Sequence, residues 1–150
     1  MTKEEIISTI DKLIPELSGI EFALLGTCGL YLQGITSLVP KDFDILTNDN
    51  GIHLASEKFG SELFSGEDSK YLETEFHLNG IEIHFVSTDK NPVRPDNCLP
   101  LVETVNFEGR KIPCMSLTSE YEAYSQMGRD KDKAKLSLIR AALEKRVETV

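Results

Sequence analysis

The chain of 150 residues lacks any apolar run that approaches the roughly 20 residues needed to cross a bilayer. Its first residues are charged and lead into an amphipathic stretch, which is unlike a signal peptide. Basic residues are the minority, because 16 Lys and Arg stand against 25 Asp and Glu, for a net charge of −9. Binding to a nucleic-acid backbone or to a membrane is therefore not expected, and we predict a cytoplasmic protein. The acidic balance indicates solubility first and a cationic small substrate second.

Cysteine is also scarce, with Cys28, Cys98 and Cys114 standing alone and no CxxC spacing. Isolated cysteines are typical of reduced thiols in the cytosol and predict no zinc site. Cys28 lies in a glycine-containing turn, but the sequence places no histidine near it, so a nucleophile there is disfavoured. The phosphate-binding patterns GxxxxGK[ST] and GxGxxG are both missing.

What the chain does contain predicts an α+β fold, a small mixed sheet with helices on one face and a C-terminal helical extension. We expect a single structural domain, with an α+β core over 1–116 and helices over 117–150 packed on it. Hydrophobic periodicity predicts helices over 3–17, 30–34, 50–59, 118–127 and 130–147. The first is opened by a capping box of Thr2 and Glu5, and the third is capped by Asp49 or Asn50. Strands are expected over 21–25, 42–46, 71–78, 81–86, 101–105 and 111–115.

The clearest local signal is Asn79-Gly80, a two-residue hairpin turn between two alternating strands. In this register Glu75 faces His84 and His77 faces Glu82. One face of the hairpin is apolar and belongs to the core, while the other carries Glu73, Glu75, His77, Glu82 and His84. Plain solvent exposure explains the histidines as well as metal ligation beside Glu82 does.

Asp42 and Asp44 lie two residues apart on a predicted strand, so their carboxylates project from one face. Like charges held close together raise each other's proton affinity, and a hard divalent cation such as Mg²⁺ relieves that repulsion. By itself the pair is more simply a solvated strand edge. Glu82 strengthens the metal interpretation, because an acid inside an apolar strand gains nothing structurally, and it is the natural third carboxylate.

Gly26-Thr27 separates a predicted strand from a short helix. Such a turn lets backbone N–H groups approach phosphates, although most glycines in these turns serve conformation only. Positive charge for a triphosphate would come from Lys41, Arg129, Lys131 and Lys133. The alternating charges over 129–133 are, however, more typical of a solvated helix start.

Taken in order, the strand, Gly26-Thr27, the short helix, Asp42-x-Asp44 and Glu82 resemble the nucleotidyltransferase superfamily of the DNA polymerase beta type. The resemblance is to its small antibiotic-modifying members, and the segments 81–84 and 110–116 are similar to those of lincosamide nucleotidyltransferases. The resemblance implies that the three acids hold Mg²⁺, with Glu82 acting as a metal ligand or as the base. It also implies an NTP as substrate, with ATP as the first candidate. Gly26 and Thr27 would contact its phosphates. Lys41 is added to these phosphate-binding residues because of its positive charge.

The sequence departs from that pattern in three places. Thr27 stands where Gly or Ser is commoner, Leu38-Val39-Pro40-Lys41 replaces an Arg and a Thr, and Glu82 is longer than the usual Asp. The predicted reaction is transfer of a nucleoside monophosphate to a hydroxyl of a small molecule, an aminoglycoside or lincosamide being the candidate by resemblance.

Two other functions remain open. A minimal nucleotidyltransferase can be the antitoxin of a toxin–antitoxin pair, either non-catalytic or adding AMP to its protein partner. The chain would otherwise be a nucleotide- or metal-binding module without transfer activity. An apolar stripe of Leu136, Ile139, Leu143 and Val147 would contact a partner or pack on the core, and a homodimer is compatible with the sequence.

Overall fold

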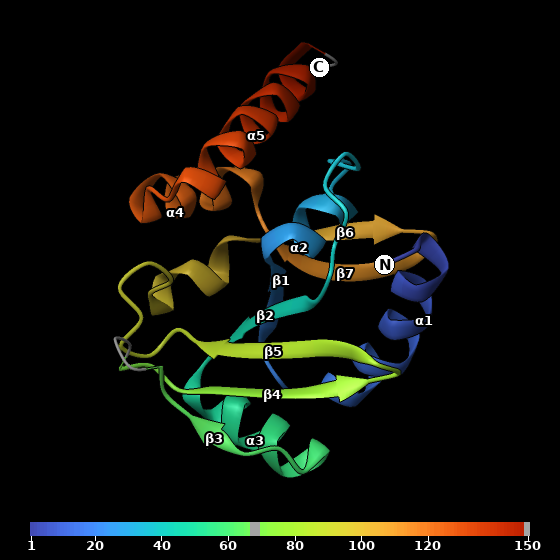
Figure 1. Ribbon diagram of the computed structural model, residues 1–150, viewed down its shortest axis with the longest axis vertical. Coiled ribbons are helices and arrows are strands. Elements are labelled where there is room, and N and C mark those ends of the chain that lie inside the picture. The colour runs from blue at the N-terminus through green and yellow to red at the C-terminus, as the bar shows by residue number, and fades with distance from the viewer. Residues whose placement is uncertain (67–69, 149–150) are drawn as a thin grey trace.

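A mixed seven-stranded sheet organises the computed structural model, which describes residues 1–66 and 70–148 (Figure 1). The strands run in the order β3-β4-β5-β2-β1-β7-β6. Their bounds are β1 Phe22–Leu25, β2 Phe43–Thr47, β3 Leu63–Phe64, β4 Glu73–Leu78, β5 Ile81–Ser87, β6 Val102–Phe107 and β7 Arg110–Met115. The helices are α1 Lys3–Leu13, α2 Gly26–Leu32, α3 Asp49–Phe59, α4 Leu117–Met127 and α5 Asp130–Glu148, with 3-10 helices η1 Ile14–Leu17 and η2 Asp96–Leu101. The predicted α+β class is confirmed.

Two parallel pairings join the outer hairpins to the centre of the sheet. β2 lies parallel to β5, and β1 lies parallel to β7, while β1 and β2 are antiparallel to each other. The β4–β5 hairpin has the predicted register, with Glu75 opposite His84 and His77 opposite Glu82. Asn79 takes a positive φ of 55° and Gly80 one of 77°, as a two-residue hairpin turn requires.

Apolar side chains pack on both faces of the sheet. Residues of α1 and α3, including Ile6, Ile10 and Ile52, pack against Phe43 and Phe85 on one face. On the other face η2 covers a smaller cluster through Leu99, which packs with Ala23, Leu25, Leu46 and Met115. The second face is only partly covered, and the polar ends of β2 and β5 remain accessible there.

The ends of two predicted helices differ from expectation. The segment 3–17 begins with the predicted capping box, in which the Glu5 N–H donates to Thr2 Oγ1 at 3.1 Å. It changes from α to 3-10 after Leu13, because Pro15 has no N–H for an α-helical bond. α3 is capped by Asn48, whose side chain accepts a hydrogen bond from the Gly51 N–H at 2.8 Å. The predicted caps, Asp49 or Asn50, were therefore wrong, by one and by two residues.

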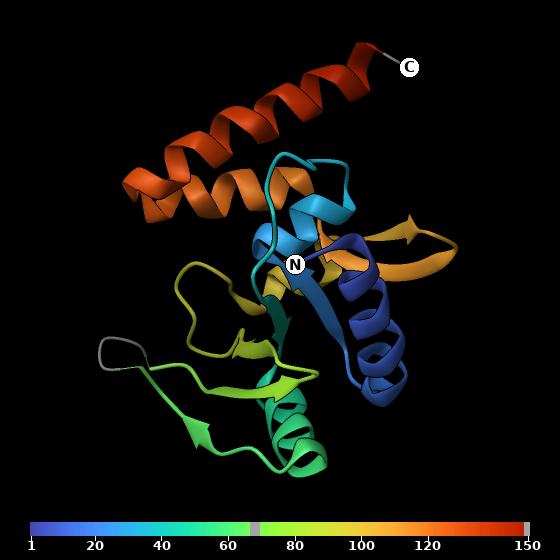
Figure 2. The same cartoon turned by 45° about the vertical axis from the view of Figure 1, so that its right-hand side comes forward.

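The C-terminal helices α4 and α5 form a hairpin at one end of the molecule, next to α2 (Figure 2). Leu30 of α2 packs with Leu117, Tyr124 and Ile139 in one buried cluster. Three residues of the apolar stripe, Leu136, Ile139 and Leu143, belong to this cluster, whereas Val147 is 75% exposed. Most of the stripe therefore packs within the chain. No helix in the described part of the chain is both long and apolar enough to span a membrane.

We expect Ile139→Ala to lower the free energy of unfolding by about 2–4 kcal/mol, because the side chain is fully buried. Val147→Ala is the matched control on the same helix and should change it by less than about 0.5 kcal/mol. Urea unfolding followed by circular dichroism and by tyrosine fluorescence measures both. A single transition in both signals would support one structural domain. A separate transition for the C-terminal helices α4 and α5, called the tail below, would contradict it.

Candidate active site

The parallel pairing of β2 with β5 brings the predicted carboxylates to one region of the sheet. Asp44 lies beside His84 in the register, Asp42 immediately precedes β2, and Glu82 lies two residues before His84. Burial raises the pKa of Asp42, and the charges of Asp44 and Glu82 raise it further. The three acids that the sequence singled out therefore share one electrostatic environment.

His84 lies between two carboxylates. Its Nδ1 is 3.5 Å from Asp44 Oδ1, and its Nε2 is 2.7 Å from Glu73 Oε1. Hydrogen bonding to Asp44, and then to Glu73, raises the pKa of His84 to about 9, against the opposing effect of burial. Glu73 and not Glu75 is the acid that contacts His84, because Glu75, the register partner, is exposed while Glu73 is buried.

The turn at Gly26 allows Asp44 to approach closely. Gly26 has φ +71°, and a Cβ at this position would lie 2.8 Å from Asp44 Oδ2. Only glycine therefore satisfies both the backbone conformation and the space beside Asp44. Gly26 is the first residue of α2, so the predicted short helix begins at the turn itself instead of near Leu30.

The Gly26 N–H already has a hydrogen-bond partner within the protein. It donates to Oε2 of Glu120 at 3.1 Å, and Glu120 is 1% exposed. A carboxylate from α4 thus takes the place at the start of α2 that an anion would otherwise occupy. Gly26 lines the cavity beside Asp44, and its contact with phosphate stays a prediction, for which the bond to Glu120 is a competing use of the N–H.

A cavity of about 320 Å³ opens beside Asp44 and receives residues from both the sheet and the tail. Gly26, Thr27, Asp44 and His84 line it together with basic residues, which are Arg94, Arg129, Lys131 and Lys135. Tyr71, Val86, Pro92, Val93 and Tyr124 add apolar and aromatic surface. The cavity therefore combines a carboxylate with several cations.

The basic residues of the cavity differ in how they are paired. Arg129 donates to Asp132 at 2.7 and 3.0 Å, and Asp132 is fully buried. Among the ion pairs of residues 1–66 and 70–148, none includes Lys131 or Lys135. Burial lowers the pKa of Lys135, the charge of Asp132 opposes this, and the like charges of Arg129 and Lys131 add to the lowering. A bound anion would relieve this crowding of positive charge.

Several predicted residues lie outside the cavity. Asp42 and Glu82 are near Asp44 but do not line it, and Lys41 is exposed and does not line it either. Lys133 forms a solvent-exposed ion pair with Asp130 at 3.2 Å. The interpretation of the charged segment 129–133 as a solvated helix start is therefore right for this residue. His77, considered as a metal ligand, is exposed on β4.

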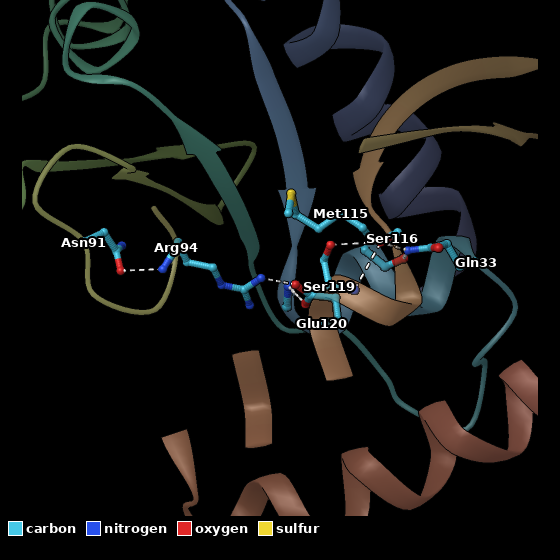
Figure 3. Close-up of polar contacts among 9 residues, drawn as sticks. Gln33, Asn91, Arg94, Met115, Ser116, Ser119 and Glu120 are labelled. Carbon is cyan, nitrogen blue, oxygen red and sulfur yellow. Dashed lines mark hydrogen bonds and ion pairs between the residues drawn. The ribbon is translucent and has the colours of Figure 1, made fainter. Parts of the chain in front are cut away.

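Sequence reasoning missed Arg94, Glu120 and Lys135. Arg94 follows β5 in an irregular segment, Glu120 lies on α4, and Lys135 lies on α5. Figure 3 shows Arg94 reaching toward Glu120 from the segment after β5. A local pattern does not reveal these residues, because their partners lie far away along the chain.

The donor atoms fit a hard cation, although the side chains are not arranged as a complete metal site. Among the described residues, no three His, Cys, Asp or Glu side chains form a group that holds a metal ion. Asp42 and Asp44 supply oxygen donors, and the repulsion among Asp42, Asp44 and Glu82, which adds to the effect of burial on the pKa of Asp42, is what Mg²⁺ would relieve. These carboxylates would hold the ion together with phosphate oxygens of a substrate.

The fold is that of the nucleotidyltransferases. The structure matches that of TM1012 from Thermotoga maritima, a putative nucleotidyltransferase, with a TM-score of 0.73, 23% identity and coverage of 97% of this chain and 96% of that one. It also matches the lincosamide antibiotic adenylyltransferase LnuA with lincomycin bound, with a TM-score of 0.58, 16% identity and coverage of 95% and 98%. No family model and no curated protein matches the sequence. The predicted resemblance is confirmed at the level of the fold.

The raised pKa of His84 predicts a pH-dependent stability of the metal-free protein. Because folding raises this pKa from 6.5 to about 9, the ion pairs stabilise the fold fully below pH 6.5 and are lost as the pH rises through 9. We expect the loss to be roughly 1–3 kcal/mol. Urea unfolding at pH 6.5 and 9.5 measures it in the wild type and in His84→Gln. Equal pH dependence in the two proteins would contradict the assignment.

Proposed function

We propose that the chain transfers a nucleoside monophosphate from a magnesium-bound NTP, with ATP preferred, to a hydroxyl of a small molecule. The observation that carries this proposal is the cavity in which Asp44 and the tail cations Lys131 and Lys135 meet. A magnesium–triphosphate needs carboxylate oxygens for the metal and cations for the phosphates. The nucleotidyltransferase fold supports the same reaction class.

The tail residues bind and orient the triphosphate in this proposal. Lys135 and Lys131 would contact its oxygens, and Arg129 would add charge while keeping its bonds to buried Asp132. Thr27 lines the same cavity and would donate a hydrogen bond from its hydroxyl. Mg²⁺, when bound by Asp42 and Asp44, neutralises charge on the phosphates. The His84 imidazolium holds Asp44 on the sheet.

The acceptor hydroxyl oxygen would attack the α-phosphorus in line. A new oxygen–phosphorus bond forms, the bond to the bridging oxygen of the β-phosphate breaks, and pyrophosphate leaves. The hydroxyl proton passes to a carboxylate, for which Glu82 is our candidate because it lies on the open sheet face near Asp42. Glu82 is thereby proposed as the base, or as a third metal ligand.

The nature of the acceptor is proposed from the surroundings of the site. The polar face of β4 and β5 is acidic, with Glu73, Glu75 and Glu82 on it, and this suits a cationic acceptor. LnuA, which shares the fold, is a lincosamide adenylyltransferase, so an antibiotic is the first acceptor to test. The antitoxin alternative gains nothing from the apolar stripe, because Leu136, Ile139 and Leu143 pack within the chain.

Mg²⁺ together with the preferred NTP should raise the melting temperature. A ligand at 100 times its Kd adds about 2.7 kcal/mol, which corresponds to roughly 5–10 °C for a domain of this size. Asp44→Asn should abolish the rise, and the exposed Asp130→Asn is the matched control that should retain it. Differential scanning fluorimetry with each of the four NTPs, with and without Mg²⁺, makes the measurement. Absence of a shift with every NTP in the wild type would reject the proposed function.

Lys135 and Lys133 provide a second matched pair. Lys135 lines the cavity, whereas Lys133 on the same helix pairs with Asp130 in solvent. Lys135→Ala should weaken binding of Mg-ATP about 10- to 100-fold, because a charge-assisted bond to phosphate contributes about 1.5–3 kcal/mol. Lys133→Ala should leave the Kd within about threefold. Isothermal titration calorimetry measures both, and equal effects would show that the cavity is not the phosphate site.

A further inference from the structure

A buried ion pair connects the tail to the Gly26 turn. Glu120 on α4 accepts the Gly26 N–H on Oε2 at 3.1 Å, and its Oε1 accepts a hydrogen bond from the Arg94 guanidinium. The side chains of Glu120 and Arg94 are 1% and 6% exposed. Buried charges of this kind are tolerated only when they are paired and hydrogen-bonded. Both oxygens of Glu120 are used, and each has a different partner.

Arg94 is itself held in place by the segment that follows β5. The Asn91 Oδ1 accepts the backbone N–H of Val93 at 3.0 Å and of Arg94 at 2.9 Å. The Asn91 amide donates to the carbonyl of Ser87, the last residue of β5, at 3.1 Å. The guanidinium is therefore presented to Glu120 from a backbone that is anchored to the sheet (Figure 3).

α2 is attached to the tail side of the molecule at its other end as well. Gln33, which follows α2, donates to the carbonyl of Met115 at 2.9 Å and to that of Gly29 at 3.2 Å. Ser116, next to Met115, caps α4 by accepting the Ser119 N–H at 3.1 Å. Figure 3 shows these contacts around the start of α4. Hydrogen bonds therefore connect both ends of α2 to α4 or to the segment that leads into it.

We propose that Glu120 is a positioning residue, whose carboxylate, neutralised by Arg94, holds the Gly26 turn against Asp44. The inference deepens the proposed function and rests on it only for its consequence in nucleotide binding. Because the Gly26 N–H is committed to Glu120, phosphate contacts fall to Thr27 and to the cations of the tail. Gly26, having no Cβ, lets Asp44 Oδ2 lie close to a turn that Glu120 keeps in place.

Two double variants separate this role from a general effect on stability. Arg94→Met/Glu120→Leu removes both charges and the acceptor for the Gly26 N–H. Arg94→Met/Glu120→Gln removes both charges but retains an amide oxygen as acceptor. Replacing a buried ion pair by uncharged residues is often tolerated, and thermal unfolding first establishes that both variants fold. The two proteins then differ only at residue 120, which offers the Gly26 N–H an amide oxygen in the Gln variant, together with an NH2 donor, and no acceptor in the Leu variant.

Amide hydrogen exchange of Gly26, measured by NMR, is the direct readout. We expect the Gly26 amide to exchange about tenfold faster in the Leu variant than in the Gln variant, because the loss of one hydrogen bond changes the equilibrium for opening of the amide about tenfold. The Kd for Mg-ATP should follow the same order, with the Leu variant weaker by about tenfold. Equal Gly26 exchange in the two variants would overturn the proposal, and so would equal Kd values when exchange differs.

The wild type supplies a test that needs no variant. A scalar coupling across the hydrogen bond, between the Gly26 amide nitrogen and the Glu120 carboxyl carbon, should be detectable, and its absence would overturn the proposal. A wild type that binds no NTP but shows this coupling and the exchange difference would reject the proposed function alone. The two failures are therefore distinguishable.

Discussion

The parallel pairing of β2 with β5 is the constraint on which the rest of the site depends. It sets Asp44 beside His84, and β1, paired with β2 on the other side, leads directly into the Gly26 turn. A slip of one residue in either register would turn Asp44 toward the apolar core. The burial of Phe43 and Ile45 on the opposite face prevents that slip, so the core packing and the site are specified by the same alternation.

Charge in the site is divided between two parts of the fold. The sheet contributes carboxylates, with the pKa of Asp42 raised by burial and by its acidic neighbours, while the tail contributes cations, with the pKa of Lys135 lowered mainly by burial. Both groups also lie near like charges, and a ligand that carries a metal cation at one end and phosphates at the other would offset that repulsion. This division is the physical basis on which we propose magnesium–triphosphate binding.

The tail is also part of the architecture of the site. Ile139 and Tyr124 pack against Leu30 of α2, and Glu120 accepts the first N–H of the same helix. α2 therefore lies between the sheet and the tail, in contact with both. This arrangement explains why a turn that in the family pattern is expected to meet phosphates is here held by a protein carboxylate, while cations from α5 line the cavity.

The sequence by itself determined the local structure: the capping box of α1, the Asn79-Gly80 hairpin with its register, and the alternation of β2 that buries Phe43 and Ile45 and leaves Asp44 on the other face. Such features depend on residues a few positions apart, so a pattern suffices to predict them. Only the tertiary structure decided that Glu73 contacts His84, that Lys135 lines the cavity where Lys41 had been expected, and that Glu120 takes the Gly26 N–H. Gly26 and Glu120 are 94 positions apart, and no periodicity in the chain links them. Their contact follows from the packing of α4 on α2, which many small apolar contacts decide together.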